Sequence, residues 1–349
     1  MSVDLLHPDI SPAPMANAIS AFHASEIRRE HLRYDRIISL SDSEFNNTDF
    51  ASVFDLRAKL FGESARPSDR CRKILGFNGD PEVQALWGQA QYAIIYVRDK
   101  QFQTVVGASM FSTMACPPEL KEKSGYDATI AADYLFVDTP YQGQGVADRL
   151  MTERQACAEK FLASLDQSTP IGRPRTLIFN EFDDPLRLTP AEYKEGTEHC
   201  GISPVQRAIV WYNKGYRTFP FAYLEPASDD REQPDRQTTL NVLVAAPSHS
   251  IKPEFLDPIS TDLIARHLTS HTAICRKVGR DPHSDPSFNQ LQERISVCDS
   301  HMPIDRRPFL QKIALSIEEL LARDLSPTET ATPIWQLLGR QNPEEGLEF

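Results

Sequence analysis

Apolar and polar residues follow two different periods along the chain. Short apolar runs bounded by turn residues predict β-strands; they lie at 35–41, 92–97, 104–111, 131–137, 176–180, 216–223 and 238–246. Apolar residues that recur every three or four positions predict helices; these lie at 50–61, 81–90, 146–164, 204–214, 260–278, 286–298 and 308–323. A polar stretch at 98–101 predicts a hairpin turn. Both kinds of element are interleaved, which predicts an α/β (α+β) fold.

Composition narrows the class of protein. The chain has 349 residues, of which 40% are hydrophobic and 25% charged, as in an ordinary globular protein. Lys+Arg 37 against Asp+Glu 49 gives a net charge of −12. Binding to nucleic acid or to anionic lipid needs a broad basic field, so we expect neither partner. An anionic ligand must therefore be held by a local site.

Cysteine spacing and hydropathy indicate the compartment. The six cysteines lie far apart, and no basic stretch followed by an apolar run marks the start of the sequence. We therefore expect a reduced, cytoplasmic protein. No apolar run approaches the roughly 20 residues that span a bilayer, so we expect no membrane segment.

A glycine-rich turn follows the predicted strand 131–137 and precedes a long predicted helix. Gly143 and Gly145 leave backbone amides unobstructed beside a helix N-terminus, where partial positive charge favours a phosphate. A Walker loop needs Gly-Lys-Ser/Thr, and Val146 after Gly145 excludes it. A dinucleotide fingerprint starting at Gly143 needs a small residue where Asp148 stands, so that match is weak. The turn predicts an anion site of another type.

The hexapeptide Gln142-Gly-Gln-Gly-Val-Ala147 resembles the acyl-CoA pyrophosphate loop of the GNAT acyltransferases, written Gln/Arg-x-x-Gly-x-Gly/Ala. Gln142, Gly145 and Ala147 stand on its defining positions. Leu-Phe-Val at 135–137 is similar to the family's strand that pairs with pantetheine. Ala-Ile-Val-Trp-Tyr-Asn-Lys-Gly-Tyr at 208–216 is similar to the second motif, usually Ala-Ile-x-x-Tyr-x-Lys-x-Gly-Phe.

The resemblance implies a GNAT acyltransferase domain over 35–247, with an N-terminal arm over 1–34 and a C-terminal helical extension over 248–349. The central sheet is expected to be mixed, mostly antiparallel, flanked by helices and splayed at Val137. The extension could serve as a homodimer interface or as a lid over the acceptor.

The resemblance also implies a function: acyl-CoA-dependent N-acyltransfer, expected to be N-acetyltransfer, to a primary amine in a ternary complex. Acetyl-CoA or another acyl-CoA is the expected co-substrate. The residues expected to bind it are Phe136, Val137, Gln142, Gly143, Gln144, Gly145, Val146 and Ala147. A backbone N–H of Phe136 or Val137 is expected to stabilise the oxyanion. Two alternatives stay open: a non-catalytic acyl-CoA sensor or assembly module, and an acyltransferase that uses an acyl-carrier-protein donor.

Transfer to an alkylamine needs a base, because the amine is mostly protonated at pH 7. The predicted base is Glu181, expected just beyond the strand 176–180, with Asp183 and Asp184 as alternatives.

The acid that protonates the departing thiolate depends on the register of the second motif. Tyr212 is the predicted acid if the Ala-Ile-x-x-Tyr register is kept. This sequence has one residue fewer between the tyrosine and the glycine than the family motif, so counting back from Gly215 puts Trp211 at the tyrosine position instead. An indole cannot supply a proton to the thiolate. Tyr223 is a lesser candidate.

The segment 181–200 carries six acidic residues against Arg187 and Lys194. It would attract a cationic small-molecule amine, such as a polyamine, an amino sugar or a lysine side chain. A solvated acidic loop explains the same charges equally well.

Two further clusters are weighed and set aside. Cys200 follows His199, but adjacent residues rarely face one another, and Cys116 and Cys157 are expected to be core residues, so we do not expect a cysteine acyl-enzyme. His267, His271 and Cys275 share one face of a predicted helix, but further zinc ligands are not evident, so packing is expected and no metal is predicted.

Overall fold

The structure, a computed structural model, describes residues 31–37, 47–61, 75–78, 80–165, 174–219, 223–224, 237–245, 258–268 and 286–339. Within them the chain forms an eight-stranded sheet in the order β1-β2-β3-β4-β5-β8-β6, with β7 paired to β8. The strands are β1 Leu32–Ile37, β2 Ala90–Asp99, β3 Thr104–Ala115, β4 Ala128–Val137, β5 Thr176–Asp183, β6 Arg217–Thr218, β7 Tyr223–Leu224 and β8 Gln237–Ala245. Neighbours are antiparallel except β4 and β5, which are parallel. The expected mixed, mostly antiparallel sheet is confirmed.

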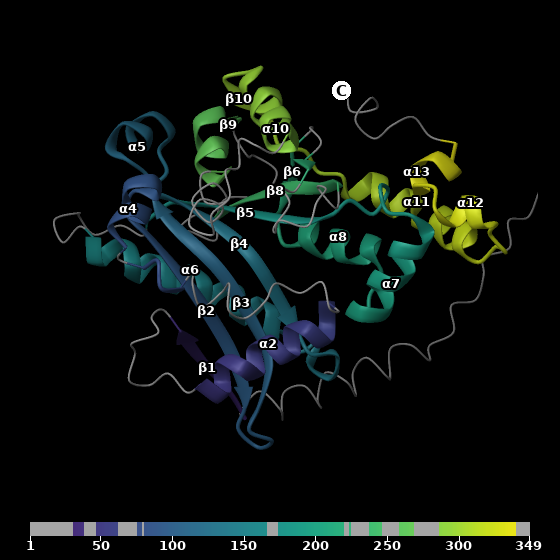
Figure 1. Cartoon of the computed structure of the whole chain (residues 1–349), viewed down its shortest axis with the longest axis horizontal. Helices are drawn as coiled ribbons and strands as arrows, with labels where there is room; N and C mark the ends of the chain where they lie inside the picture. Colours follow the sequence, from purple (N-terminus) through teal and green to yellow (C-terminus); the bar gives the residue numbers. More distant parts are fainter. Residues whose placement is uncertain are drawn as a thin grey trace, which may run out of the picture.

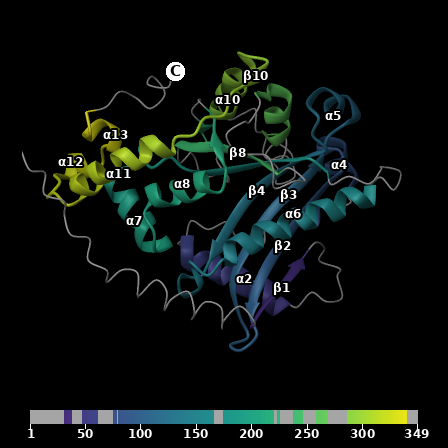
Figure 2. The ribbon, with the colours of Figure 1, turned by 180° about the vertical axis from the view of Figure 1, so that it is seen from behind.

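Helices cover both faces of the first half of the sheet. Helices α2 (Asn47–Phe61) and α4 (Pro81–Trp87) lie on one face, and α6 (Val146–Leu165) lies on the other (Figures 1 and 2). Phe50, Val53 and Phe54 of α2 are buried against β2 and β3. Leu150 and Ala158 of α6 are fully buried on the opposite face. Each helix thus uses the apolar stripe that the sequence pattern predicts.

C-terminal segments pack on the second half of the sheet. Beyond β8 the described elements are β9 (Ile259–Ser260), α10 (Pro286–Ser296), β10 (Ser300–His301), α11 (Arg307–Leu321), α12 (Pro327–Thr330) and α13 (Ile334–Leu337), with a helix at 261–268 between β9 and α10. The 261–268 helix and α10 share a core with Leu177 and Phe179 of β5. Helix α11 packs with α7 (Pro190–Cys200) and α8 (Pro204–Asn213) in a further core (Figure 1). The expected C-terminal helices are present: the 261–268 helix and α10 pack on one face of β5, and α11 packs against α7 and α8.

The domain boundaries at 34/35 and 247/248 stay predictions. Strand β1 begins at Leu32, so its first residues fall in the segment predicted as an arm. Residues 269–278, which complete the predicted helix 260–278, lie outside the described part of the chain.

Helices α5 (Pro118–Ser124), α7, α12 and α13 lie outside the predicted helix ranges. In α5, Pro118 stands at the first turn, where proline is tolerated. Helix α7 occupies much of the supposed acidic loop, and Thr189 and Glu192 cap it reciprocally. That capping box was visible in the sequence and could have identified α7. The predicted strand 216–223 is instead two short strands, β6 and β7.

Candidate active site

The parallel strands β4 and β5 pair over only half of their length. Their register runs from Ala128 opposite Thr176 to Ala132 opposite Asn180 and then stops. The expected splay is present, but it begins after Ala132 rather than at Val137. Figure 1 shows the two halves of the sheet diverging beyond this point.

A β-bulge marks the start of the splay. Met110 of β3 lies opposite Tyr134 and Phe111 lies opposite Ala132, so Asp133 is the extra residue on β4. A bulge of this kind bends the strand that carries it and increases its twist. Beyond the bulge β4 pairs with β3 alone among the described strands. Its other edge, at 133–137, therefore faces the splay with backbone groups that a ligand could pair with. No motif in the sequence signalled this bulge.

The glycine-rich turn lies at the far end of that edge. A short 3₁₀ helix, Thr139–Tyr141, leads into Gly143 and Gly145, whose φ angles are 71° and 76°. These angles lie in the left-handed region, where an L side chain is strained and glycine is not. Helix α6 begins at Val146, directly after the turn. Its first backbone N–H groups have no partner within the helix and form the positive end of a 20-residue dipole.

Both glutamines of the turn brace its backbone. The Gln142 side-chain amide donates to the carbonyl oxygens of Val137 at 3.2 Å and Cys200 at 3.1 Å. The Gln144 amide donates to the carbonyl oxygen of Pro140 at 2.8 Å. Gln142 thus ties the turn to the end of β4 and to the end of α7. In this arrangement the glutamine amides hold the turn, and its backbone N–H groups are the candidate anion donors.

The two motifs of the family resemblance meet in space. Asp148, in the first turn of α6, forms an ion pair with Lys214, which follows α8. The pair offsets an acidic residue that would oppose an anion at this helix end. Arg149 pairs with Glu153 at 2.5 Å on the exposed side of the same helix.

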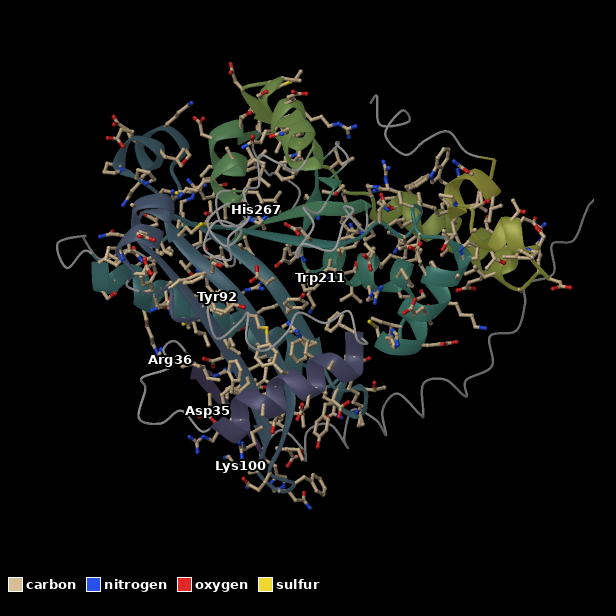
Figure 3. All side chains as sticks on the ribbon, in the orientation of Figure 1. Asp35, Arg36, Tyr92, Lys100, Trp211 and His267 are labelled. Atoms are coloured by element: carbon tan, nitrogen blue, oxygen red, sulfur yellow. The ribbon has the colours of Figure 1, made fainter. Side chains whose placement is uncertain are left out.

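Trp211 and Tyr212 point to different cores. Trp211 packs in the core shared with α6, edge-on to Tyr216 with ring centroids 5.0 Å apart, and Figure 3 labels it between the halves of the sheet. Tyr212 is 2% exposed and packs with α11. Burial raises the pKa of its hydroxyl well above the ordinary value, against an opposing hydrogen bond with Thr218. The acid role of Tyr212 stays a prediction. The side chain of Tyr223 lies outside what the structure describes.

Glu181 stands next to the apex of the splay. Strand β5 continues to Asp183, so Glu181 lies within the strand and not beyond it, one residue after the last pair with β4. Its carboxylate Oε1 lies 3.1 Å from Nε2 of His267, in the 261–268 helix. The side chain of Glu181 is 16% exposed, so it is accessible but largely desolvated.

Asp184, an alternative base, is occupied in the core. Its carboxylate accepts from Arg306 Nη1 at 2.9 Å and from the Leu186 N–H at 3.1 Å. Burial alone would raise the pKa of Asp184, but Arg306 and these hydrogen bonds outweigh it and hold the pKa below its ordinary value. Asp183 lies 3.9 Å from Arg207. Of the three acidic residues considered, Glu181 is the one placed at the splay and paired with histidine.

The cysteines and His199, considered above as nucleophile and base, are buried or bonded to other side chains. Burial raises the pKa of the Cys116 thiol to about 11 and also raises that of Cys157, so both thiols are neutral at pH 7. Arg207 donates to the Cys200 sulfur at 2.6 Å, and His199 lies near Glu195. Among the described residues no cluster of His, Cys, Asp and Glu could hold a metal ion. His271 and Cys275 lie outside the described ranges.

A hollow of about 640 Å³ lies elsewhere, along the edge strand β1. Its lining includes Tyr34, Tyr96 and Cys157 and mixes acidic and basic groups, but it reaches neither the glycine turn nor Glu181. None of the helices described here combines the length and the hydropathy that crossing a bilayer requires.

Comparison with known proteins found similarity to solved structures only. No family model matches the sequence, and no curated protein matches it. An acetyltransferase of the GNAT family from Staphylococcus aureus is 10% identical, with 61% of this chain and 99% of that chain covered and a TM-score of 0.31. Arabidopsis thaliana NAA60 in complex with a bisubstrate analogue is 11% identical, with 62% of this chain and 100% of that chain covered and a TM-score of 0.34. An aminoglycoside acetyltransferase from an uncultured soil metagenomic sample, in complex with sisomicin, is 16% identical. The match covers 45% of this chain and 80% of that chain, with a TM-score of 0.29.

Proposed function

We propose that this chain is an acyl-CoA-dependent N-acyltransferase that transfers an acyl group, expected to be acetyl, to a primary amine. One observation carries the proposal: the glycine turn at the N-terminus of α6 follows directly after the end of β4, whose edge at the splay pairs with no described strand. A pyrophosphate and an amide-containing arm, joined as in CoA, match these two neighbouring donor sets.

The residues that would hold acyl-CoA are those of the turn and the strand end. Backbone N–H groups over 143–147 suit the pyrophosphate, because the two left-handed glycines leave them open and the helix dipole adds positive potential. Phe136 and Val137 suit the pantetheine amides, and one of their N–H groups suits the developing oxyanion. The −12 net charge does not oppose this, since the positive potential is local.

Glu181 is the proposed base on the other side of the splay. It would take one proton from the acceptor ammonium, which leaves a neutral amine that attacks the thioester carbonyl. When the C–S bond breaks, the second amine proton goes to the thiolate, giving an amide and free CoA. The Glu181 side chain is suited to this role by its place, because it stands beside the splay and is 16% exposed.

The acceptor is proposed to be a small cationic amine. The acidic stretch 181–200 supports this less than its composition suggests, because Asp184 is neutralised by Arg306 and Glu192 caps α7. Glu181, Glu195 and Glu198 keep charge on this side of the molecule. The cytoplasmic location and the homodimer through the C-terminal extension stay predictions.

A non-catalytic acyl-CoA module is the second candidate. The burial of Tyr212 favours it, because a tyrosine packed against α11 is poorly placed to protonate a thiolate. Trp211 packs on the α6 side, and its indole cannot replace Tyr212 as the acid.

Thiol release from acetyl-CoA, measured with spermidine, glucosamine and Nα-acetyl-lysine, separates the two candidates. An enzyme releases thiol in the presence of at least one amine, and Glu181→Gln lowers that rate by about a hundredfold or more. Asp183→Asn is the matched control, since it removes a neighbouring carboxylate that is not paired with His267. Tight CoA binding by calorimetry without thiol release would instead identify the non-catalytic module.

A further inference from the structure

One polar contact joins the C-terminal segments to the proposed base. His267 Nε2 lies 3.1 Å from Glu181 Oε1, across 86 positions of sequence. The His267 side chain is 3% exposed, so this contact is almost fully desolvated on the histidine side. Figure 3 labels His267 beside the strands of the second half of the sheet.

The imidazole is held in place by an aromatic stack. Its ring lies 4.7 Å from the ring of Phe179, at an interplanar angle of 13°. Phe179 precedes Glu181 by two positions on β5, so both side chains project from the same face of the strand. Leu263 and Leu268 of the same helix are buried in the surrounding core. The stack and the helix together fix the direction in which Nε2 points.

Hydrogen-bond chemistry gives the contact its direction. An ionised carboxylate only accepts hydrogen bonds, so the Nε2–H of His267 donates to Oε1 of Glu181. A donor to the charged form of a carboxylate favours that form. The same contact restricts the rotamers of Glu181. A carboxylate offers about four lone-pair sites, so it can accept this bond and still take a proton from an amine.

We propose that His267 is a positioning residue for acyl transfer, which holds Glu181 ionised and in one rotamer beside the splay. The inference rests on the proposed function and extends it: the C-terminal extension completes the acceptor side of the site. In the transfer step Glu181 takes the ammonium proton and later gives it to water, while His267 keeps its own proton and its hydrogen bond throughout.

Four variants test the proposal. His267→Asn keeps an amide but is too short to reach Glu181, whereas His267→Gln places an amide nitrogen where Nε2 stands. The double variant Glu181→Gln/His267→Asn asks whether His267 acts through Glu181. His301→Asn is the matched control. His301 also packs edge-on to Phe219, in the core that contains Leu177 and Phe179, but its Nε2 bonds the Ile295 carbonyl and not Glu181.

The assay is thiol release from acetyl-CoA by the full chain with the best amine of the panel above. We expect His267→Asn to lower kcat by roughly tenfold to a hundredfold, with the KM for acetyl-CoA unchanged within twofold. His267→Gln recovers most of kcat, His301→Asn retains it, and the double variant is no slower than Glu181→Gln alone.

The outcomes distinguish a failure of this inference from a failure of the proposed function. An additional loss in the double variant, or equal losses in His267→Asn and His267→Gln, would mean that His267 only supports the fold. A His267→Asn enzyme as fast as the parent would overturn the inference and leave the proposed function intact. A parent chain without thiol release from any amine of the panel overturns the proposed function and this inference with it.

Discussion

The two strands that bound the splay are stabilised in different ways. On the β4 side the glutamine contacts are mostly local: Gln142 bonds a carbonyl five positions back and Gln144 bonds one four positions back, whereas the second bond of Gln142, to Cys200, spans 58 positions. On the β5 side they are remote: Glu181 contacts a residue 86 positions away, and Asp184 contacts one 122 positions away. The β4 side offers backbone donors, whereas the β5 side offers side chains.

This difference assigns separate roles to the two sides. A turn of glycines and a helix end form an anion site whose donors all come from a few consecutive residues. The β5 side depends on the C-terminal segments, which supply one partner to the candidate site and another to the core. Variants on the β4 side should therefore change ligand binding more than folding. Variants at Asp184 and its partner should do the reverse.

The largest expected effect is on stability, from Arg306→Met. The change leaves the buried Asp184 carboxylate without its main partner, and breaking a buried pair costs about 3–5 kcal/mol. Urea unfolding at pH 7 measures it. Arg307→Met is the matched control: Arg307 pairs with Asp305 at 3.1 Å but its side chain is 37% exposed, so its loss should cost under about 1 kcal/mol.

A double replacement sharpens this result. Asp184→Leu with Arg306→Met removes both charges, and an apolar pair in a buried site is often as stable as the ion pair it replaces. We expect the double variant to regain much of the stability that Arg306→Met loses. Equal stability of Arg306→Met and Arg307→Met would show that the ion pair with Asp184 does not stabilise the fold.

The next largest effect is on ligand binding, from Gly145→Trp. The new side chain covers the amides of the turn, and it also strains a residue whose φ is 76°. We expect calorimetry to show CoA binding abolished, a loss of at least roughly a hundredfold, or about 2.7 kcal/mol.

Gly339→Trp controls for backbone strain in that experiment. Gly339 has a similar φ of 62°, open space around its Cβ position and a place near the C-terminal end of the described chain. Both variants should lose similar stability, on the order of 1–2 kcal/mol, but Gly339→Trp should bind CoA normally. Unchanged CoA affinity in Gly145→Trp would remove the central support for the proposed function.

The same contrast explains how much could be predicted from the sequence. The turn, the helix after it and the strand before it were predicted, because a period-2 run, two glycines and a 3.6-residue period are local signals. The start of the splay was misplaced by five positions, since a one-residue bulge at Asp133 leaves no trace in hydropathy.

The β5 side was harder to predict, for a physical reason. Asp184 was an alternative base because no residue near it in sequence indicates the pairing with Arg306. His267 was expected only to pack, because its partner Glu181 is 86 positions away. Tertiary pairing decides the protonation and burial of such groups, and periodicity does not report it. The acid role of Tyr212 and the identity of the acceptor stay predictions.

The smallest expected effect is a dependence of stability on pH. Because the pKa of Asp184 is lower in the folded state than in the unfolded chain, folding favours its ionised form. Its contribution to stability is fully present above the unfolded pKa, near 4. It is lost as the pH falls from there through the folded pKa, by about 1.4 kcal/mol for each pH unit over which the unfolded state holds one more proton.

Comparison with Asp184→Asn isolates this contribution from those of other carboxylates. The stability gap between the parent chain and Asp184→Asn, measured by urea unfolding from pH 7 to pH 3, should narrow below about pH 4. In Arg306→Met the dependence on pH should weaken, because only the Leu186 N–H and Arg187 then oppose the effect of burial on the pKa of Asp184. A gap that stays constant with pH would mean that the pKa of Asp184 is the same in the folded and the unfolded chain, and the β5 side would then lack the stabilising buried ion pair that distinguishes it from the β4 side.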